Sequence, residues 1–270
     1  MASFVRSAAA VISLAVVGGV TACSGGNADD TLLVGATPAP HGQILEFIKE
    51  NLAEEAGLNL EIREFTDYNQ PNAALDAGDL DANFFQHQPF LDEYNKASDA
   101  DLVSVTGVHV EPLGAYSSSI DNLADLPDGA QVSIPADASN GGRALKLLAD
   151  NGLITLADGA GTLATEDDIV GNPSNVEIVP LEAAELTRSL EDVDLAVING
   201  NYAIEADLVP SKDSLAIEST DDNPYVNLLV TNANKTDDPD VVALGELLNS
   251  PEVADFIKET FSDGSVIPAF

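Results

Sequence analysis

From residue 31 onward, short apolar runs alternate with longer segments of helical periodicity. The run at 31–36 is rich in branched residues and predicts a buried strand. Between 41 and 56 the apolar residues recur at helical spacing, and Gly57 stops the predicted helix. Over 58–65 polar and apolar residues alternate as in a strand. Strand, helix and strand in this order form a βαβ unit, which predicts a parallel sheet.

The same alternation continues toward the C-terminal end of the chain. Further helices are predicted over 72–77, 89–97, 141–151, 182–190, 239–249 and 251–261, and further strands over 81–85, 103–110, 131–134, 176–179, 195–198 and 225–231. Because the chain changes direction around 111–114, it forms two successive α/β series, and we expect an α/β fold with two lobes. Lobe 1 would span 31–114 with a C-terminal return at 227–270, and lobe 2 would span 115–226. Ligands of open α/β sheets bind at the carboxyl ends of strands, so the ligand cleft is expected between the lobes.

The first 22 residues have the parts of a secretory signal peptide. Arg6 precedes an apolar run at 8–20, and small residues lead to Cys23, the only cysteine of the chain. The Val-Thr-Ala-Cys ending resembles the bacterial lipobox, so we expect acyl chains such as palmitate at Cys23 and a lipidated linker at 23–30. The alternatives are a transmembrane anchor, for which the run is shorter than the roughly 20 residues needed, and a secreted protein with a chance cysteine. The lipoprotein interpretation predicts an extracytoplasmic protein anchored to the cell membrane.

The net charge of the chain disfavours one class of binding partner, the nucleic acids. It has 46 Asp and Glu residues against 10 Lys and Arg, with a net charge of −36. Such a chain repels phosphate backbones, so nucleic-acid binding is not expected. The acids are scattered and not gathered in one tail. We therefore interpret them as a solvated acidic coat and assign no chemistry to them.

Two candidate segments follow strands of the first series. In the segment 65–72, Asp67 or Asn69 can cap the next helix, which leaves Tyr68 free to offer an aromatic face. In the segment 81–90, two adjacent aromatics on a strand point to opposite sides, so one of Phe84 and Phe85 would be core and the other would face the cleft. His87 follows directly, either as a structural hydrogen-bonding residue or as a site residue. It has no second histidine or cysteine nearby at metal-ligand spacing, so neither a metal nor a cofactor is expected.

Two more segments follow strands of the second series. Ser139 or Asn140 can cap a predicted helix whose first turn carries Arg143, next to free backbone N–H groups that attract anions. This arrangement predicts a carboxylate site, because a guanidinium binds a carboxylate through two parallel hydrogen bonds. The alternative is a salt bridge from Arg143 to one of the many acids. Asn199 places an amide after a buried run, and Asn227 places one inside an otherwise apolar strand, where it would bind either backbone or a ligand.

Nothing in the sequence indicates catalysis. Gly-x-Ser-x-Gly is absent, and no histidine has a sequence partner that marks a catalytic triad. We therefore expect a binding protein and not an enzyme. The alternatives are an enzyme on the same fold that uses His87 as a general base, and a surface lipoprotein without a role in transport.

Taken together, the polar segments resemble the methionine-binding lipoproteins of ABC importers, the MetQ/NlpA family. The resemblance covers about 33–270, and its motifs are Asp67-Tyr68-x-x-Pro71-Asn72, Asp81-Ala82-Asn83-Phe84-Phe85-Gln86-His87, Asn140-x-x-Arg143-Ala144-Leu145, Asp168-Ile169-x-x-Asn172-Pro173, Val197-Ile198-Asn199 and Tyr225-Val226-Asn227. It implies a two-lobed periplasmic-binding-protein fold, similar to type II, that captures methionine or a close analogue. The ligand would then pass to a permease driven by an ATPase.

The same resemblance implies a role for each candidate residue. Arg143 would bind the ligand carboxylate with Asn140 nearby, and Asn199 and Asn227 would hold the amino-acid head. The ligand side chain would be surrounded by Tyr68, Phe85 and His87. Two features depart from the family pattern: the pair Gly141-Gly142 follows Asn140, and Asn201 stands beside Asn199, so either amide or both could reach the ligand.

Overall fold

The computed structural model describes residues 31–221 and 223–270. The predicted signal peptide, Cys23 and the linker lie outside the described residues. None of the helices in the described ranges is long and apolar enough to cross a membrane.

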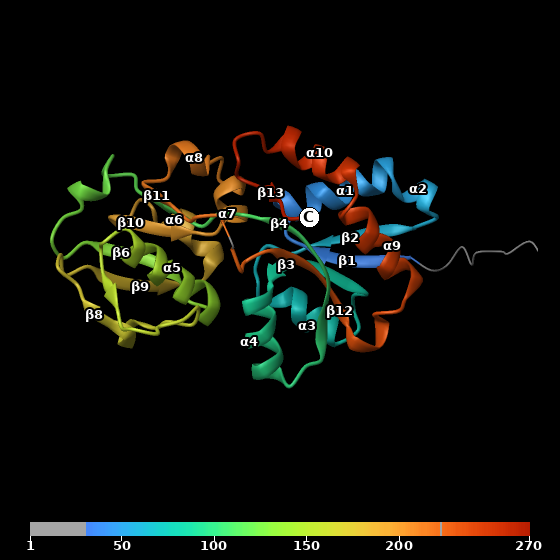
Figure 1. Ribbon diagram of the computed structural model, residues 1–270, viewed down its shortest axis with the longest axis horizontal. Helices are drawn as coiled ribbons and strands as arrows, with labels where there is room; N and C mark the ends of the chain where they lie inside the picture. Colours follow the sequence, from blue (N-terminus) through green and yellow to red (C-terminus); the bar gives the residue numbers. More distant parts are fainter. Residues whose placement is uncertain (1–30, 222) are drawn as a thin grey trace, which may run out of the picture. The chain divides into compact units, whose positions relative to one another are not determined.

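The first sheet has six strands in the order β13-β4-β12-β3-β1-β2 (Figure 1). Their bounds are β1 Leu32–Ala36, β2 Leu60–Glu64, β3 Ala82–His87, β4 Leu102–Val110, β12 Asn227–Asn232 and β13 Ile267–Pro268. Strand β1 pairs in parallel with β2 and β3, which confirms the predicted βαβ unit. Strand β12 runs antiparallel between β3 and β4, so a segment from late in the chain completes the centre of this sheet.

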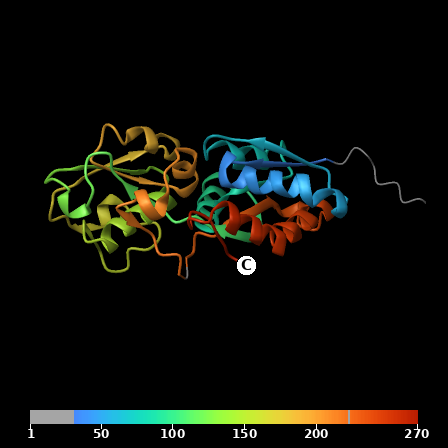
Figure 2. The same cartoon turned by 90° about the horizontal axis from the view of Figure 1, so that it is seen from above.

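Helices cover both faces of the six-stranded sheet. Apolar side chains of α1 (Gln43–Asn51), α9 (Pro239–Leu248) and α10 (Pro251–Thr260) share one core with β1. On the opposite face, α3 (Gln70–Asp76) and α4 (Gln88–Ser98) pack around a second core that includes Leu75, Leu91 and Val230. Figures 1 and 2 show the two groups of helices on either side of the sheet. The helical turn η1 (Pro38–Gly42) and the short helix α2 (Ala53–Ala56) flank α1.

The second sheet has five strands in the order β11-β5-β10-β6-β9. Their bounds are β5 Gly114–Tyr116, β6 Gln131–Pro135, β9 Glu177–Leu181, β10 Leu195–Ile198 and β11 Ala216–Ile217. Its core on one face is formed with α5 (Ala138–Asp150), and on the other with α6 (Leu186–Ser189) and α7 (Gly200–Glu205). A separate pair, β7 (Thr155–Leu156) and β8 (Ile169–Gly171), and the helix α8 (Pro210–Asp213) complete this part.

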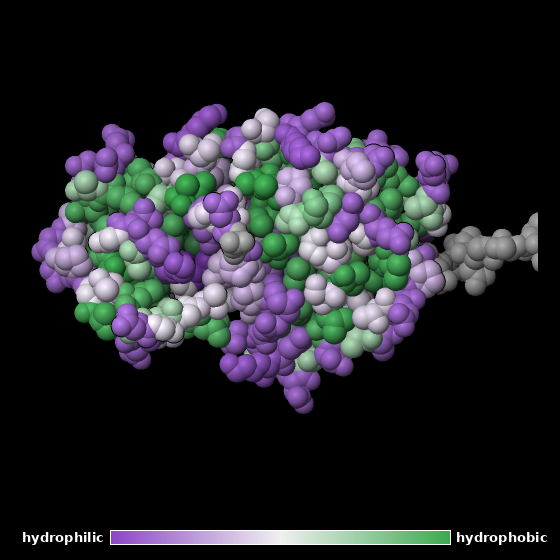
Figure 3. Space-filling model, viewed as in Figure 1, coloured by the Kyte–Doolittle hydropathy of each residue, from purple (hydrophilic) through white to green (hydrophobic). Residues whose placement is uncertain are grey.

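The chain passes from the first sheet to the second between β4 and β5, and it returns between β11 and β12. Both passages lie at strand ends, so these ends of the two sheets lie close together. This is the two-lobed α/β fold that the sequence predicts. Figure 3 shows hydrophilic residues in many places on the visible face, interspersed with hydrophobic ones.

Two expectations about local structure were wrong. The helix predicted over 182–190 is only a helical turn, η4 (Ala183–Glu185), followed by the four-residue α6. The helix predicted over 141–151 begins at Ala138, because the side chain of Asp137 accepts a hydrogen bond from the backbone N–H of Asn140 at 2.9 Å. Asp137 is therefore the N-cap that the sequence analysis assigned to Ser139 or Asn140.

Candidate ligand-binding site

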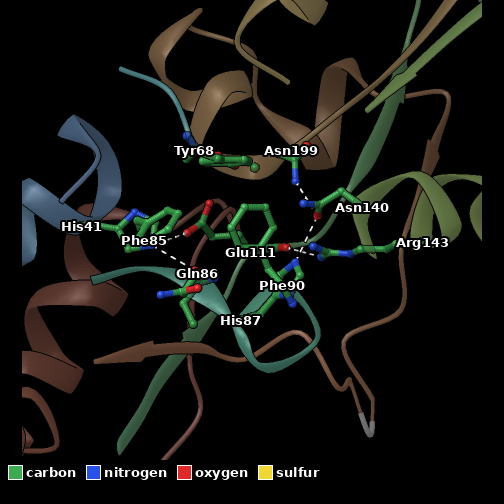
Figure 4. Close-up of a pocket in the computed structure, with 13 residues that line it drawn as sticks. His41, Tyr68, Phe85, Gln86, His87, Phe90, Glu111, Asn140, Arg143 and Asn199 are labelled. Carbon is green, nitrogen blue, oxygen red and sulfur yellow. Dashed lines mark hydrogen bonds and ion pairs between the residues drawn. The ribbon is translucent and has the colours of Figure 1, made fainter. Parts of the chain in front are cut away.

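One pocket collects all seven predicted ligand-binding residues: Tyr68, Phe85, His87, Asn140, Arg143, Asn199 and Asn227. Its empty volume, with the solvent at its mouth included, is about 340 Å³. Three of these residues stand at strand ends or directly after them, since β3 ends at His87, β10 ends just before Asn199 and β12 begins at Asn227, whereas Asn140 and Arg143 lie in the first turns of α5. Figure 4 shows the labelled side chains converging from these elements.

His87 is fixed as a neutral imidazole by two hydrogen bonds. The backbone N–H of Phe90 donates to Nδ1 at 3.3 Å, because His87 is the N-cap of α4. Nδ1 is therefore an acceptor, and Nε2 carries the proton and donates to Oδ1 of Asn140 at 3.0 Å. Burial, and then the charge of Arg143, lower the pKa of His87 to about 3. His87 therefore makes structural hydrogen bonds, which was one of the two alternatives, and it also lines the pocket.

Asn140 joins the two lobes through its amide. Its Oδ1 accepts from His87 and also from Nδ2 of Asn199 at 2.9 Å. Its Nδ2 donates to the two carboxylate oxygens of Asp137 at 3.0 and 3.1 Å. The amide of Asn140 is therefore fully engaged, whereas Oδ1 of Asn199 is buried and has no partner among the described residues.

Arg143 is buried and forms the salt bridge that the sequence analysis left as an alternative. Its Nε donates to Oε1 of Glu218 at 2.8 Å, and its Nη2 donates to Oε2 of Glu218 at 2.5 Å. Nη2 also donates to the backbone oxygen of Glu111 at 2.8 Å, and the guanidinium carbon lies 4.2 Å from the ring centroid of Tyr225. Within the described part of the chain, Nη1 makes no hydrogen bond.

The second glycine of the pair that follows Asn140 is required for steric reasons. A Cβ on Gly142 would lie 2.4 Å from the backbone oxygen of Thr162, closer than any side chain tolerates. Gly142 therefore allows the chain around Thr162 to pack directly on the first turn of α5.

Asn227 is oriented by a short relay of side chains. Its Oδ1 accepts from Nε2 of His41 at 3.0 Å, and Nδ1 of His41 lies 2.7 Å from the hydroxyl of Thr37. Because Nε2 must donate to Oδ1, Nδ1 accepts the hydroxyl proton, and His41 is neutral. Burial lowers the pKa of His41 to about 4. The side chain of Asn227 is thus bound by another side chain and not by backbone, and its Nδ2 is left to bind other groups.

Glu111 is a pocket residue that the sequence analysis did not identify. It is buried, and its Oε1 lies 2.8 Å from Nε2 of His109 and 3.3 Å from Nε2 of His41. Burial raises the pKa of Glu111 and lowers that of His109 to about 3. His109 lies in β4 and Glu111 stands two residues later, directly after the strand, so the spacing that gives side chains a shared direction was visible in the sequence. The approach of His41 was not, because it depends on the packing of η1.

Three aromatic rings line one side of the pocket. The ring centroids of Tyr68 and Phe85 are 5.9 Å apart, and each lies 5.8 Å from the centroid of Phe90. Phe84, the neighbour of Phe85, is fully buried in the core, which confirms that the two face opposite ways. The hydroxyl of Tyr68 donates to Oδ1 of Asn201. Asn201 also lines the pocket, and its Nδ2 is buried without a partner in the described ranges.

The pocket has further lining residues that were not predicted. They are His41, Gln86, Phe90, Glu111 and Gly200. Gln86 and Phe90 lie within or next to a motif already singled out, so their neighbourhood was a usable signal. Gln86 belongs to a buried amide network, in which it exchanges hydrogen bonds of 2.8 and 2.6 Å with Asn72.

Comparison with known proteins places the chain among lipoproteins. The family model described as NlpA lipoprotein matches residues 32–270. The chain is 44% identical over 235 residues to the D-methionine-binding lipoprotein MetQ of Salmonella typhimurium, covering 86% of each protein. It is 43% identical to Outer membrane lipoprotein 2 of Mannheimia haemolytica, covering 87% of this chain and 85% of that protein.

Solved structures with the same fold have about the same sequence identity to this chain as the relatives above. A nutrient-binding protein from Burkholderia cenocepacia, bound to methionine, is 45% identical with a TM-score of 0.85, and the match covers 89% of this chain and 100% of that one. The methionine-binding protein MetQ is 40% identical with a TM-score of 0.86, covering 89% and 98% of the two chains.

Proposed function

This chain belongs to the NlpA lipoprotein family, and we propose that it is the substrate-binding protein of an ABC importer that captures methionine or a close analogue. Its relatives include proteins named for methionine binding and a structure bound to methionine. The observation that carries the proposal is the convergence of seven residues, distant in sequence, on one pocket. We propose the lobes as 31–114 with 227–270, and 115–226.

The proposed site matches the chemistry of methionine. Nη1 of Arg143 and Nδ2 of Asn227 are donors available to the ligand carboxylate, because the other polar atoms of these side chains are engaged within the protein. Oδ1 of Asn199 is a buried acceptor available to the amino group. Tyr68 and Phe85 supply the aromatic faces on which a thioether gains about 0.3–1.5 kcal/mol for each contact.

Arg143 holds the carboxylate in this proposal while Glu218 holds Arg143. A guanidinium can bind a carboxylate through two parallel hydrogen bonds, but Arg143 already forms this pair of bonds with Glu218. The ligand carboxylate would therefore accept hydrogen bonds from Nη1 and from amide donors. In a buried pocket a charge without such partners is costly. Such a set of fixed partners rejects analogues that lack the matching group, since the partners would stay unpaired.

The proposal does not include catalysis. The enzyme alternative requires His87 as a general base, but both its nitrogens are hydrogen-bonded and its pKa is lowered to about 3. A base works best with a pKa near the pH at which it acts. The lipid anchor would be attached at Cys23 after removal of residues 1–22, and the partners would be a membrane permease and its ATPase. Closure of the lobes on methionine would present the loaded form to the permease.

Two measurements on the full chain test the proposal: mass spectrometry of the small molecules that the protein releases, and calorimetry. The protein is first unfolded mildly, and the released small molecules are identified by mass spectrometry; methionine or a methionine derivative is expected. Titration with L- and D-methionine should then show binding, and Arg143→Ala should weaken it at least tenfold. Lys146→Ala is the matched control, because Lys146 lies on the same helix but is exposed and paired with Asp150 at 2.8 Å. Unchanged affinity in Arg143→Ala would remove Arg143 from the site.

A further inference from the structure

A second cavity lies between α5 and the passage of the chain from β11 to β12. Its apolar wall is formed by Leu147 of α5 and by Ile217, Pro224 and Tyr225. The empty volume of this cavity, with the solvent at its mouth included, is about 890 Å³. Arg143 lines it and also lines the ligand pocket, so the two cavities share one side chain. None of the roles proposed above uses the second cavity.

Two features of this wall are left unsatisfied by the fold itself. Ile217 is a large apolar side chain on a strand, yet it is 43% exposed. The hydroxyl of Tyr225 is buried and has no hydrogen-bond partner among the described residues. Exposed apolar area and a buried polar group without a partner both cost free energy. Both features therefore suit an occupant with an apolar body and a polar atom.

The charges around the cavity favour a cation as this occupant. Lys146 is paired with Asp150 at 2.8 Å, so this pair offers no free positive charge to an anion. Arg143 is likewise paired with Glu218. Asp221, a further acid of the lining, forms no salt bridge within the described ranges. Because the whole chain has a net charge of −36, it attracts small cations and repels small anions.

The cavity also lies at the hinge between the lobes, because Glu218 binds the other passage of the chain. The backbone N–H of Glu218 donates to the backbone oxygen of Leu113 at 2.9 Å, and the N–H of Leu113 donates to Oε2 of Glu218 at 3.3 Å. The same carboxylate accepts two hydrogen bonds from Arg143. Glu218 thus connects both passages with the side chain that is proposed to hold the methionine carboxylate.

Tyr225 forms a second connection between the two cavities. Its ring centroid lies 4.2 Å from the guanidinium carbon of Arg143 and 5.0 Å from the ring centroid of His87. Arg143 and His87 belong to different lobes, and His87 is hydrogen-bonded across the lobes to Asn140. An occupant that packs against Tyr225 therefore favours the arrangement in which the lobes are in contact, since a ligand shifts an equilibrium toward the state that it binds better.

We propose that this cavity is a second binding site, which takes a small organic ammonium ion with an apolar body and raises the affinity for methionine by stabilising the contact between the lobes. The effect on methionine rests on the proposed function, whereas the site itself does not. Coupling between two sites is reciprocal, so methionine must raise the affinity for the ammonium ion by the same factor.

Calorimetry on the full chain with 2-phenylethylammonium tests the site. We expect a Kd of about 1 mM or lower, which is reasonable for a ligand of this size. The matched probe 3-phenylpropanoate has a similar shape and the opposite charge, and it should bind about tenfold more weakly or not at all.

Two lysine substitutions at exposed apolar residues locate the bound ammonium ion. Ile217→Lys removes apolar contact and adds a like charge, so it should weaken binding by about tenfold or more. Val170→Lys makes a comparable change on β8, at a side chain that is 68% exposed and does not line the cavity, and should alter the affinity by less than about twofold. Both variants should bind methionine alone as the wild-type protein does, which also shows that they are folded. If Ile217→Lys does not fold, Asp221→Asn is a milder variant at an exposed position and should weaken the ammonium ion about threefold.

The coupling is measured by repeating the titration with saturating L-methionine, which should raise the affinity for the ammonium ion about fivefold or more. The site is overturned if the wild-type protein shows no saturable binding of the ammonium ion, or if the variants at the cavity bind it as the wild-type protein does. Displacement of the ammonium ion by methionine would place it in the methionine pocket and would also overturn the site. Binding that methionine leaves unchanged would overturn the coupling. If the chain binds no methionine, the proposed function fails and the coupling with it, whereas the titrations without methionine still decide the site.

Discussion

Nε2 of His87 donates to Oδ1 of Asn140 at 3.0 Å, and this bond joins β3 of the six-stranded sheet to α5 beside the five-stranded sheet. It depends on a neutral imidazole, because the N–H of Phe90 occupies Nδ1. A protonated ring would lose that acceptor and place a charge near Arg143. The bond therefore links the protonation of one histidine to the contact between the lobes.

The first prediction concerns the pH dependence of stability. The pKa of His87 is about 3 in the folded protein and 6.5 as its ordinary value, so between pH 5 and 6 only the unfolded chain binds this proton. Stability from this group is present above pH 6.5 and is lost as the pH falls, at about 1.4 kcal/mol per pH unit. His87→Gln should reduce the slope of unfolding free energy against pH by about 1 kcal/mol per unit. Urea unfolding at pH 5.0, 5.5 and 6.0 measures it, and an unchanged slope would contradict a neutral His87.

The second prediction concerns the relay that orients Asn227. Thr37→Val removes the hydroxyl that donates to Nδ1 of His41, so His41 no longer has a fixed tautomer and Asn227 can turn its amide. We expect methionine affinity to fall about three- to tenfold, the equivalent of losing about one hydrogen bond. Thr231→Val is the matched control, because Thr231 is also fully buried and its hydroxyl binds the backbone oxygen of Asp81 at 2.7 Å, away from the pocket. Calorimetry should separate the two variants, and equal losses would refute the relay.

The third prediction concerns the ligand side chain. Phe85→Leu removes an aromatic face but keeps an apolar side chain, so it should weaken methionine binding more than binding of norleucine, whose methylene replaces the sulfur. The preference for methionine should fall about two- to tenfold, from a loss of about 0.3–1.5 kcal/mol. Phe47→Leu, at a ring stacked 4.3 Å from Phe256, should leave the preference unchanged. Competition binding with the two amino acids measures it. A preserved preference in Phe85→Leu would exclude the ring from contact with sulfur.

The fourth prediction concerns Glu218, which holds Arg143 at two points. Glu218→Gln removes the charge and one acceptor, so the guanidinium loses its fixed plane and Nη1 its direction. Methionine affinity should fall about threefold to tenfold, while Asp150→Asn, at the exposed partner of Lys146, should have no effect. Tighter binding in Glu218→Gln would mean instead that Glu218 competes with the ligand for the guanidinium.

The fifth prediction concerns the acidic coat. With a net charge of −36 the folded chain repels itself, and added salt screens this repulsion, since the Debye length falls from about 10 Å at 0.1 M to about 3 Å at 1 M. The melting temperature of the full chain should therefore rise by several degrees between 0.05 and 1 M NaCl. Differential scanning calorimetry measures it. A constant or falling melting temperature would show that the acids lie too far apart to destabilise the fold.

Local patterns predicted many of the elements because the forces behind them act over a few residues. The βαβ unit from 31 to 65 follows from apolar spacing alone, and so does the opposite orientation of Phe84 and Phe85. The helix over 182–190 failed because a helix this short depends on tertiary packing more than on its own periodicity. The cap at Asp137 was misplaced by two or three residues, because helix boundaries are the least reliable part of a prediction from sequence.

The sequence by itself determined which residue types stand at the strand ends, and with them the polar and aromatic character of the pocket. Only the tertiary structure decided which atoms remain available to a ligand. Arg143 was recognisable from its position in the first turn of a helix, but its pairing with Glu218, 75 residues away, depends on how the chain returns from β11 to β12. Likewise, His41 and Glu111 meet only because η1 packs against the end of β4. Spacing along a chain specifies neighbours within an element, whereas the packing of separate elements selects which donors and acceptors satisfy each other.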